Sequence, residues 1–219
     1  MWSYYGSKSK LVNLYPEPKH DLIIEPFAGS ARYALKYWDR DVIILDKHKP
    51  IIDLWNWLQK ASDNDLDNLP RLREGENLDN FNLSYGEFLF MSFIVNEGNF
   101  GLRKTATKRA APKINHKIET TKDILPKIKH WDIRLGSYQD LDNVKATWFI
   151  DPPYIDGGQY YPESNKNIDY THLADWCKSR KGQVIVCENN NADWLPFTHL
   201  KEHWGGIKKS TEVVYYQNI

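Results

Sequence analysis

The chain is organised around residues 146–154, which read Ala146-Thr147-Trp148-Phe149-Ile150-Asp151-Pro152-Pro153-Tyr154. The first five residues predict a buried strand, and the two prolines end it at once. Neither proline can continue a central strand, because proline has no N–H group and a fixed φ. We therefore expect a carboxylate, two backbone carbonyls and the Tyr154 ring on a stiff loop at the carboxyl end of a strand. Open α/β sheets bind their ligands at this edge.

The composition is that of an intracellular protein with a full core. At 219 residues the chain has the length of one large domain, or of a domain with a sizeable insertion. Its 29 basic and 29 acidic side chains cancel, so the global charge indicates nothing about a polyanionic partner. No apolar run approaches the ~18 residues of a membrane span, and the N-terminus lacks the apolar stretch of a signal peptide. The two cysteines and seven histidines have no spacing typical of a disulfide framework or a metal site, and neither is expected.

A strand, a glycine turn and a helix follow one another near the N-terminus. Residues 21–27 predict a short buried strand that breaks at Glu25-Pro26-Phe27-Ala28-Gly29-Ser30. The apolar spacing from Ala31 to Trp38 predicts a helix. This order is half of a nucleotide-binding βαβ unit, in which the N–H groups at the helix N-terminus favour anionic groups.

A second strand, predicted at residues 42–45, ends at Asp46, about 17 residues after Gly29. A nucleoside-binding fold places a carboxylate at this point, where it accepts hydrogen bonds from ribose hydroxyls. The alternative is that Asp46 caps the next helix, predicted over residues 51–58, because Pro50 fits the first turn of a helix.

Residues 61–130 interrupt the pattern of strands, and part of this insertion is strongly basic. Residues 61–83 are polar and predict a loop, whereas Ser84 and Glu87 match a capping box for a helix that follows. Basic side chains from Arg103 to Lys117 then occur with no acid. A basic loop with glycines and an aromatic residue suits phosphate contacts, although a solvated charged loop has the same composition. The predicted nucleic-acid-binding residues are Asn99, Phe100, Arg103, Lys104, Lys108, Arg109 and Lys113.

The second half of the chain alternates helices and strands. Helices are predicted at residues 120–130 and 169–181, strands near 134–141, at 183–188 and at 212–216, and a loop rich in glycine and tyrosine at 157–161. This alternation predicts an α/β fold, with a mostly parallel twisted sheet flanked by helices and a C-terminal antiparallel strand. Residues 1–60 and 131–219 would form one domain, and residues 61–130 would form an inserted, mainly helical region.

The Asp-Pro-Pro-Tyr loop suits a reaction at an exocyclic amine. An amine conjugated with an aromatic ring, as in adenine, is a poor nucleophile, so its hydrogens must be held for the lone pair to point at an electrophilic methyl group. Asp151 and the Pro152 carbonyl supply two acceptors, and Tyr154 supplies a stacking face for the base. This is catalysis by orientation and electrostatic stabilisation. A base inside a duplex cannot reach such a loop and would have to flip out.

Five motifs occur in the order seen in Dam-like DNA N6-adenine methyltransferases, and the chain resembles that family over nearly its whole length. They are Tyr4-Tyr5-Gly6-Ser7-Lys8, Glu25-Pro26-Phe27-Ala28-Gly29-Ser30, Asp46, Asp151-Pro152-Pro153-Tyr154 and Lys209-Ser210-Thr211-Glu212-Val213. Residues 96–112 also resemble the loop of that family on its DNA-binding side. Many amino-methyltransferases share the Asp-Pro-Pro-Tyr motif, whereas its combination with the first two motifs is more specific.

The resemblance implies a Rossmann-like methyltransferase domain at residues 1–60 and 131–219, with a DNA-recognition insertion at residues 61–130. It implies S-adenosylmethionine as the methyl donor, no metal, and the N6 amine of adenine in DNA as the acceptor. The donor-binding residues would be Tyr4, Lys8, Pro26, Phe27, Gly29, Asp46 and Asp151, and the catalytic residues Asp151, Pro152, Pro153 and Tyr154. It further implies a cytoplasmic protein of bacterial or phage origin with no membrane partner. Whether the chain is a monomer, and whether a restriction system accompanies it, stays open.

Two positions depart from the family pattern. The family's Phe-x-Gly-x-Gly is Phe27-Ala28-Gly29-Ser30-Ala31 here, so alanine replaces the second glycine and a weaker affinity for the donor is expected. Where the family often has Gly-Asp-Phe, this chain has Gly136-Ser137-Tyr138, which removes an acid near the adenine ring of the donor. Two alternatives stay open. One is methyl transfer to another amine, in RNA adenine or a protein glutamine, and the other is a nucleic-acid-binding protein without catalytic activity.

Overall fold

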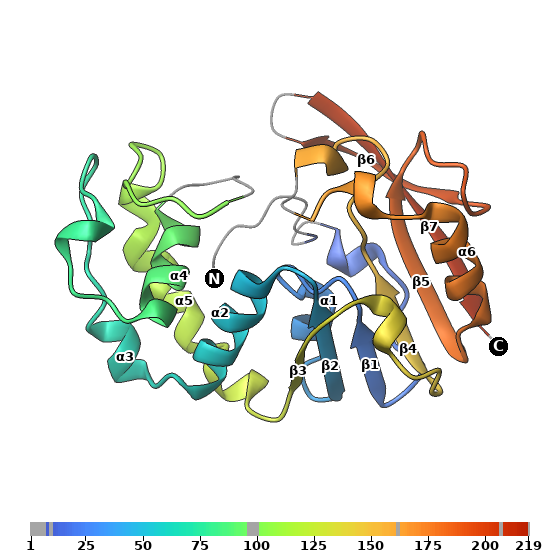
Figure 1. Cartoon of the computed structure of the whole chain (residues 1–219), viewed down its shortest axis with the longest axis horizontal. Coiled ribbons are helices and arrows are strands. Elements are labelled where there is room, and N and C mark those ends of the chain that lie inside the picture. Colours follow the sequence, from blue (N-terminus) through green and yellow to red (C-terminus); the bar gives the residue numbers. More distant parts are fainter. Residues whose placement is uncertain (1–7, 9–10, 96–100, 161–162, 206–207, 219) are drawn as a thin grey trace.

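The computed structural model has an α/β fold built on a seven-stranded, mostly parallel sheet (Figure 1). It describes residues 8, 11–95, 101–160, 163–205 and 208–218. The strands are β1 (Leu22–Glu25), β2 (Asp41–Asp46), β3 (Asp132–Leu135), β4 (Ala146–Ile150), β5 (Gly182–Asn189), β6 (Thr198–Gly205) and β7 (Lys208–Asn218). Their order across the sheet is β3-β2-β1-β4-β5-β7-β6.

Strands β1 to β5 run parallel, and β7 runs antiparallel to both β5 and β6. The strand order reverses at β1, because Ile23 lies opposite Val42 of β2 on one side and Thr147 of β4 on the other. In open α/β sheets a ligand-binding crevice forms beyond the carboxyl ends of the strands at such a switch point. The predicted α/β class, the mostly parallel sheet and the C-terminal antiparallel strand are confirmed, and the sheet is compatible with a Rossmann-like fold.

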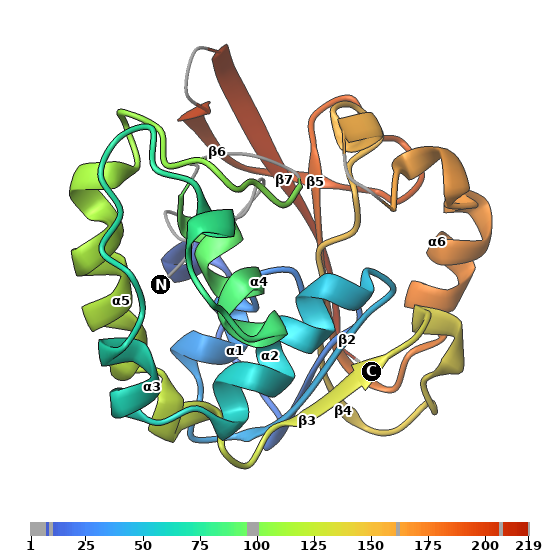
Figure 2. The same ribbon diagram turned by 60° about the vertical axis from the view of Figure 1, so that its left-hand side comes forward.

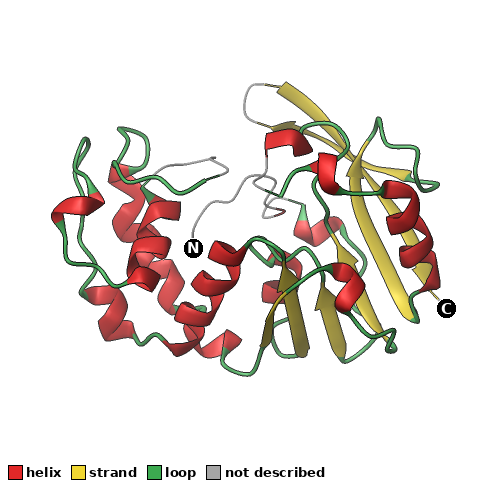
Figure 3. Cartoon of the chain, viewed as in Figure 1, coloured by secondary structure: helices red, strands yellow, loops and turns green. Residues whose placement is uncertain are grey.

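Helices cover the sheet and fill the region between β2 and β3 (Figure 3). The α-helices of the described chain are α1 (Arg32–Lys36), α2 (Lys49–Lys60), α3 (Asp63–Asp67), α4 (Tyr85–Ile94), α5 (Ile114–Lys122) and α6 (Tyr170–Ser179). Its 3-10 helices are η2 (Val12–Leu14), η3 (Leu78–Asn80), η4 (Ala111–Lys113), η5 (Leu125–Ile128), η6 (Tyr138–Asp140), η7 (Gly158–Tyr160) and η8 (Asn165–Asn167). Within the described residues no helix is long and apolar enough to span a bilayer.

Two helices differ in extent from the sequence prediction. The helix expected from Ala31 to Trp38 is only the five residues of α1, because Ala31 is left-handed and the chain leaves helical geometry at Tyr37. The helix expected at residues 120–130 is two elements, since α5 ends at Lys122 and η5 begins with Pro126 in its first turn. A proline fits there because the N–H groups of a first turn have no partner within the helix. Strand β6 was not predicted, and the loop predicted at residues 61–83 is wrong in part, because α3 and η3 lie within it.

Strand β4 is buried on both faces, as its apolar run predicts. Phe149 packs with Ile23 and Ile185 on the face where α1 and α2 lie, and its ring stacks on Tyr33 of α1 at 4.4 Å between centroids. Trp148 and Ile150 point to the opposite face, where α6 packs. The loop that follows β4 is therefore attached to a strand that is buried along its whole length.

The region 61–130 shares its hydrophobic core with the sheet. Leu89, Phe90 and Ile118 belong to the same buried cluster as Ile23 and Phe149. In Figure 2, α4 lies between α5 and α2. Gly86 allows this approach, because a Cβ there would lie 2.2 Å from the Trp57 ring. The described part of the region contains α3, α4 and α5 and none of the seven strands, while its role in DNA recognition and the division of the chain into domains stay predictions.

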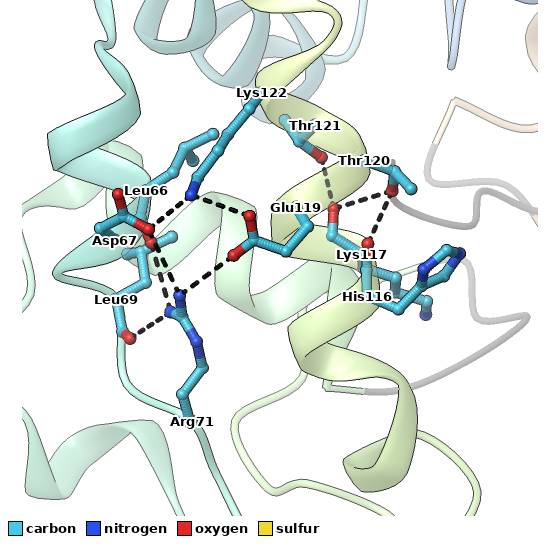
Figure 4. A network of polar contacts seen from close by, with 10 residues as sticks. All are labelled: Leu66, Asp67, Leu69, Arg71, His116, Lys117, Glu119, Thr120, Thr121 and Lys122. Carbon is cyan, nitrogen blue, oxygen red and sulfur yellow. Dashed lines mark hydrogen bonds and ion pairs between the residues drawn. The ribbon is translucent and has the colours of Figure 1, made fainter.

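Polar contacts connect α3 to α5 on the outer side of this region (Figure 4). Lys122 of α5 bridges Asp67 at 2.5 Å and Glu119 at 2.8 Å, while Arg71 lies within 4 Å of both acids, at 3.9 and 3.8 Å. The two acids are about half exposed and the two basic side chains less so, so each pair contributes little alone, but the shared partners connect α3 to α5.

Candidate active site

A cavity of about 950 Å³, partly open to solvent, lies at the carboxyl ends of β1, β2 and β4. Residues 25–32 after β1, residues 46–48 after β2, and Asp151 and Pro153 after β4 line it, together with Lys8, Tyr138 and part of the loop before α6. The structure thus gathers six of the donor-site residues predicted from sequence in one cavity: Lys8, Pro26, Phe27, Gly29, Asp46 and Asp151. The seventh, Tyr4, lies outside the described residues.

Asp46 holds the glycine turn in place. Its Oδ2 accepts a hydrogen bond from the Gly29 N–H at 3.0 Å, and its Oδ1 accepts one from the His48 N–H at 2.8 Å. His48, rather than Asp46, occupies the N-cap position of α2, so the helix-capping alternative for Asp46 is wrong. Burial raises the pKa of Asp46 to about 6, although the two backbone donors act in the opposite direction. The carboxylate remains on the cavity wall with further lone pairs available.

Ala31 adopts a conformation that alanine rarely takes. Its φ is 42° and its ψ is 48°, in the left-handed region, and its side chain is 1% exposed. The N–H of Ala31 donates to the Ala28 carbonyl at 2.6 Å, which closes the turn. The turn therefore keeps the backbone that a glycine would favour at this position, at a conformational cost of about 1–2 kcal/mol.

Glu25 is a cavity residue that sequence analysis placed in a motif but not in the site. It is 2% exposed, and its Oε1 accepts a hydrogen bond from the Ala34 N–H in the first turn of α1 at 2.6 Å. Burial raises its pKa to about 8, so this carboxyl is mostly protonated at neutral pH. Its position as an acid at the end of a predicted buried strand was the feature of the sequence that could have identified it as a site residue.

Phe27 and Tyr138 form an apolar wall of the cavity, with ring centroids 5.6 Å apart. The Tyr138 hydroxyl is 2.8 Å from His172 Nδ1. Ser137, which stands where the family often has an acid, is the N-cap of η6: its side chain accepts from the Gln139 N–H, and its own N–H donates to Asp140 Oδ2 at 2.7 Å. Asp140 is exposed and does not line the cavity, so it does not replace the missing acid.

The Asp-Pro-Pro-Tyr loop is held by side chains from β5 and α6. The Tyr170 hydroxyl donates to the Pro153 carbonyl at 2.5 Å, and Glu188 Oε2 accepts from the Ile155 N–H at 3.1 Å. No hydrogen bond from a described residue reaches the Pro152 carbonyl. The loop is thus anchored on either side of Tyr154. Pro152 is buried, and of the four predicted catalytic residues only Asp151 and Pro153 line the cavity.

Asp151 belongs to a compact charged cluster. Lys8 Nζ lies 2.7 Å from Asp151 Oδ1, 3.9 Å from Glu212 Oε1 and 4.5 Å from the centroid of the Tyr154 ring. The hydroxyls of Tyr154 and Tyr15 both donate to Glu212 Oε1, at 2.5 and 2.6 Å. The cluster joins the N-terminal segment, the loop after β4 and strand β7.

Burial and charge set the protonation of this cluster. Burial raises the pKa of Asp151 to about 6, while the neighbouring Lys8 ammonium pulls it down. Burial alone would lower the pKa of Lys8, but the charges of Asp151 and Glu212 raise it above its usual value. At neutral pH Lys8 is therefore charged and Asp151 mostly ionised. Burial also raises the pKa of Tyr154 well above its usual value, so its hydroxyl stays a neutral donor.

Sequence analysis missed the roles of Tyr15 and Glu212 in this cluster. Glu212 occurs in one of the five motifs, and an acid within an apolar strand is unusual, but Tyr15 and Glu212 are 197 positions apart. Their contact depends on the pairing of β7 with β5, which places Glu212 opposite Asn189.

The basic run lies in the region 61–130, away from the cavity lining. Arg103, Lys104, Lys108, Arg109 and Lys113 are exposed, whereas Asn99 and Phe100 lie outside the described residues. Lys104 forms an ion pair with Asp79 at 2.8 Å, while Arg103 and Lys108 form none with a described residue. Lys117 was wrongly counted in the exposed run: it is buried, and its Nζ donates to the Ile94 carbonyl at 3.5 Å.

Among the described residues no group of three or more His, Cys, Asp or Glu side chains could hold a metal ion. A scan against protein-family models and a search of curated proteins found no match to the chain.

Proposed function

We propose that the protein transfers a methyl group from S-adenosylmethionine to the N6 amine of adenine in DNA. The observation that carries this proposal is the shared cavity, in which Asp151 of the Asp-Pro-Pro-Tyr loop faces the same space as Gly29 and Asp46. That space lies at the switch point of the sheet, between β1 and β4. A nucleoside-type donor and an amine bound to Asp151 would therefore meet there.

The cavity residues fit such a donor. The space between these residues, about 950 Å³ including open solvent, is bordered by both polar and apolar side chains. Asp46 offers acceptor oxygens for ribose hydroxyls, and Phe27 and Tyr138 offer apolar contact for an adenine ring. Asp151 and Glu212 share the single ammonium of Lys8, which suits a positively charged ligand. When bound, S-adenosylmethionine supplies an electrophilic methyl group attached to a positively charged sulfur.

Asp151 orients the acceptor amine in this mechanism. Its carboxylate accepts one amine hydrogen and the Pro152 carbonyl accepts the other, so the nitrogen lone pair points toward the donor side of the cavity. With a pKa of about 6, the Asp151 carboxylate can also accept the proton that the methylated amine loses and pass it to solvent. The Tyr154 hydroxyl is bound to Glu212, so the contribution of Tyr154 to substrate binding would be its ring, as a stacking face for the base.

Exposed basic side chains support DNA as the substrate. Arg103 and Lys108 are exposed and form no ion pair with a described residue, so they are available for phosphates. Lys104 is partly neutralised by Asp79 and would contribute less. An adenine in duplex DNA would have to leave the base stack to reach Asp151.

Labelling with a radioactive methyl donor tests the function. The wild-type protein should label duplex DNA, and Asp151→Asn should reduce the rate by at least ~10²-fold, because the amine loses its orienting carboxylate. Asp142→Asn is a matched control, since it makes the same change at an exposed position before β4. Equal labelling by Asp151→Asn would exclude the role assigned to Asp151.

The same assay separates the alternatives. Label in RNA or in protein glutamine, with none in DNA, would show that the acceptor is a different amine. Calorimetry with S-adenosylmethionine separates the third case: no measurable donor binding, together with intact DNA binding, would identify a nucleic-acid-binding protein without catalytic activity.

A further inference from the structure

Glu212 is a buried acid with no direct part in the proposed transfer. It lies on β7, is 2% exposed, and uses one oxygen, Oε1, to accept hydrogen bonds from two tyrosine hydroxyls. The same oxygen is 3.9 Å from the Lys8 ammonium. An ionised carboxylate is purely an acceptor, so these three neighbours are matched to the charged form. Two hydroxyl donors and one nearby ammonium at a single buried oxygen can position the groups that carry them.

The contacts of Glu212 reach both sides of the orienting carboxylate. The Tyr154 side chain is fixed at its backbone by the loop after β4 and at its hydroxyl by β7. Lys8 Nζ lies over the Tyr154 ring, 4.5 Å from its centroid, so a stacked base would have to use the opposite face. Lys8 also binds Oδ1 of Asp151, which directs an incoming amine to the other carboxylate oxygen.

We propose that Glu212 is a positioning residue for methyl transfer: it fixes the Tyr154 ring and shares the Lys8 ammonium with Asp151, so that Asp151 presents one oxygen to the amine. This inference rests on the proposed function. Glu212 touches neither donor nor base in this scheme and acts through Tyr154 and Lys8. Because a merely structural residue would also alter activity when replaced, the test needs a readout that follows the charge of Glu212.

The protonation of Asp151 is that readout. The groups whose charges act on it are Lys8 of the N-terminal segment, Tyr15, Glu25 of β1, Tyr154 of its own loop, Cys187 and Glu188 of β5, and Glu212 of β7. Among these, the charge of Glu212 raises the pKa of Asp151 and the charge of Lys8 lowers it. Glu212→Gln keeps the shape of the side chain and removes its charge, so the pKa of Asp151 should fall.

The experiment compares the wild-type protein, Glu212→Gln and Glu202→Gln. Glu202 is exposed on β6, next to the β7 segment that carries Glu212, and provides the same charge change. For Glu212→Gln we expect kcat to fall about tenfold, with the KM for the donor changed less than about threefold. We also expect the acid limb of the pH profile, and the Asp151 titration measured by carboxyl NMR in the ligand-free protein, to move about 0.5–1 unit lower. Glu202→Gln should change neither.

A wild-type kcat in Glu212→Gln, or an unmoved Asp151 titration, would overturn the proposal. If Glu212→Gln does not fold, Tyr154→Phe removes only the hydroxyl that binds Glu212 and keeps the ring. We expect a several-fold loss of kcat in that variant, and full activity would equally overturn the proposal. Failure of the proposed function is distinct, because the wild-type protein would then label no DNA, while the NMR titration would still decide whether Glu212 and Asp151 are coupled.

Discussion

Replacing Ala31 with glycine tests the most unusual backbone conformation in the site. Ala31 is left-handed, which costs alanine about 1–2 kcal/mol relative to the right-handed region. Glycine removes that cost. The substitution also removes a buried methyl group, which costs about 0.8 kcal/mol of stability. It raises the entropy of the unfolded chain, which costs about 0.4–1 kcal/mol more. These contributions nearly cancel, so the free energy of unfolding should change by less than about 1 kcal/mol.

Ala34 provides a matched control three residues further along. It is fully buried, like Ala31, but it lies inside α1 with helical geometry. Ala34→Gly loses a buried methyl group and about 1 kcal/mol of helix propensity, with no strain to relieve. We therefore expect Ala34→Gly to destabilise the protein by about 2 kcal/mol.

Urea unfolding at 25 °C, followed by tryptophan fluorescence, measures both variants. The midpoints should differ clearly at equal m-values, with Ala31→Gly close to the wild type. Equal destabilisation by the two substitutions would refute the reasoning, because it would mean that Ala31 is not strained. The same result would remove the argument that the turn keeps the backbone of the family's second glycine.

Three further predictions concern pH and salt. Asp151 must be ionised to accept the amine hydrogen, and its pKa is raised to about 6, so kcat/KM should fall about tenfold per pH unit below pH 6 and level off above pH 7. A profile that is flat down to pH 4 would contradict this assignment. In a plot of log DNA affinity against log salt concentration, Arg103→Ala should reduce the steepness of the slope by about 0.9. Lys104→Ala should reduce it by less, because Lys104 is paired with Asp79. Equal slopes in the wild type and both variants would mean that these residues do not contact phosphates. Burial raises the pKa of Glu25 from 4.5 to about 8, so the folded protein binds an extra proton between these values and its stability should fall as pH rises from 5 to 8. Glu25→Gln should flatten that dependence in urea titrations, and an unchanged slope would show that Glu25 titrates normally.

Local signals in the sequence were sufficient to predict which strand ends carry the main residues of the candidate site. The strand before Asp151 is buried on both faces and two prolines end it, so both its position and its end could be predicted. Gly29 and Asp46 follow the first two parallel strands, and parallel strands bring their carboxyl ends to one edge. Their place in one cavity with Asp151 also depends on the strand order, in which β4 lies beside β1, and the alternation of strands and helices does not predict that order.

Three features of the structure depend on tertiary contacts and could not be predicted from the sequence. Lys117 belongs to a basic run and would be expected to be exposed. In the structure its side chain is buried between α5 and α4, and its ammonium donates to the Ile94 carbonyl. Helical periodicity extends past α1, yet a left-handed Ala31 fixes where that helix begins. Tyr15 and Glu212 come together only because β7 enters the sheet beside β5. Each of these outcomes depends on a partner that is distant in sequence.

The charge of the cluster predicts that binding of the proposed donor and ionisation of Asp151 depend on each other. With both carboxylates ionised, Asp151 and Glu212 outweigh Lys8 by one negative charge, and such an excess is costly in a buried site. A sulfonium ligand in the cavity would supply the missing positive charge and lower the pKa of Asp151, so donor binding and ionisation of the orienting carboxylate would favour each other. The thioether that remains after methyl transfer lacks this charge, so the cluster would favour its release. Calorimetry should therefore show that the preference for S-adenosylmethionine over its thioether product is larger at pH 7.5 than at pH 5.5, where Asp151 is mostly protonated. A preference independent of pH would mean that the cluster does not interact with the charge of the ligand.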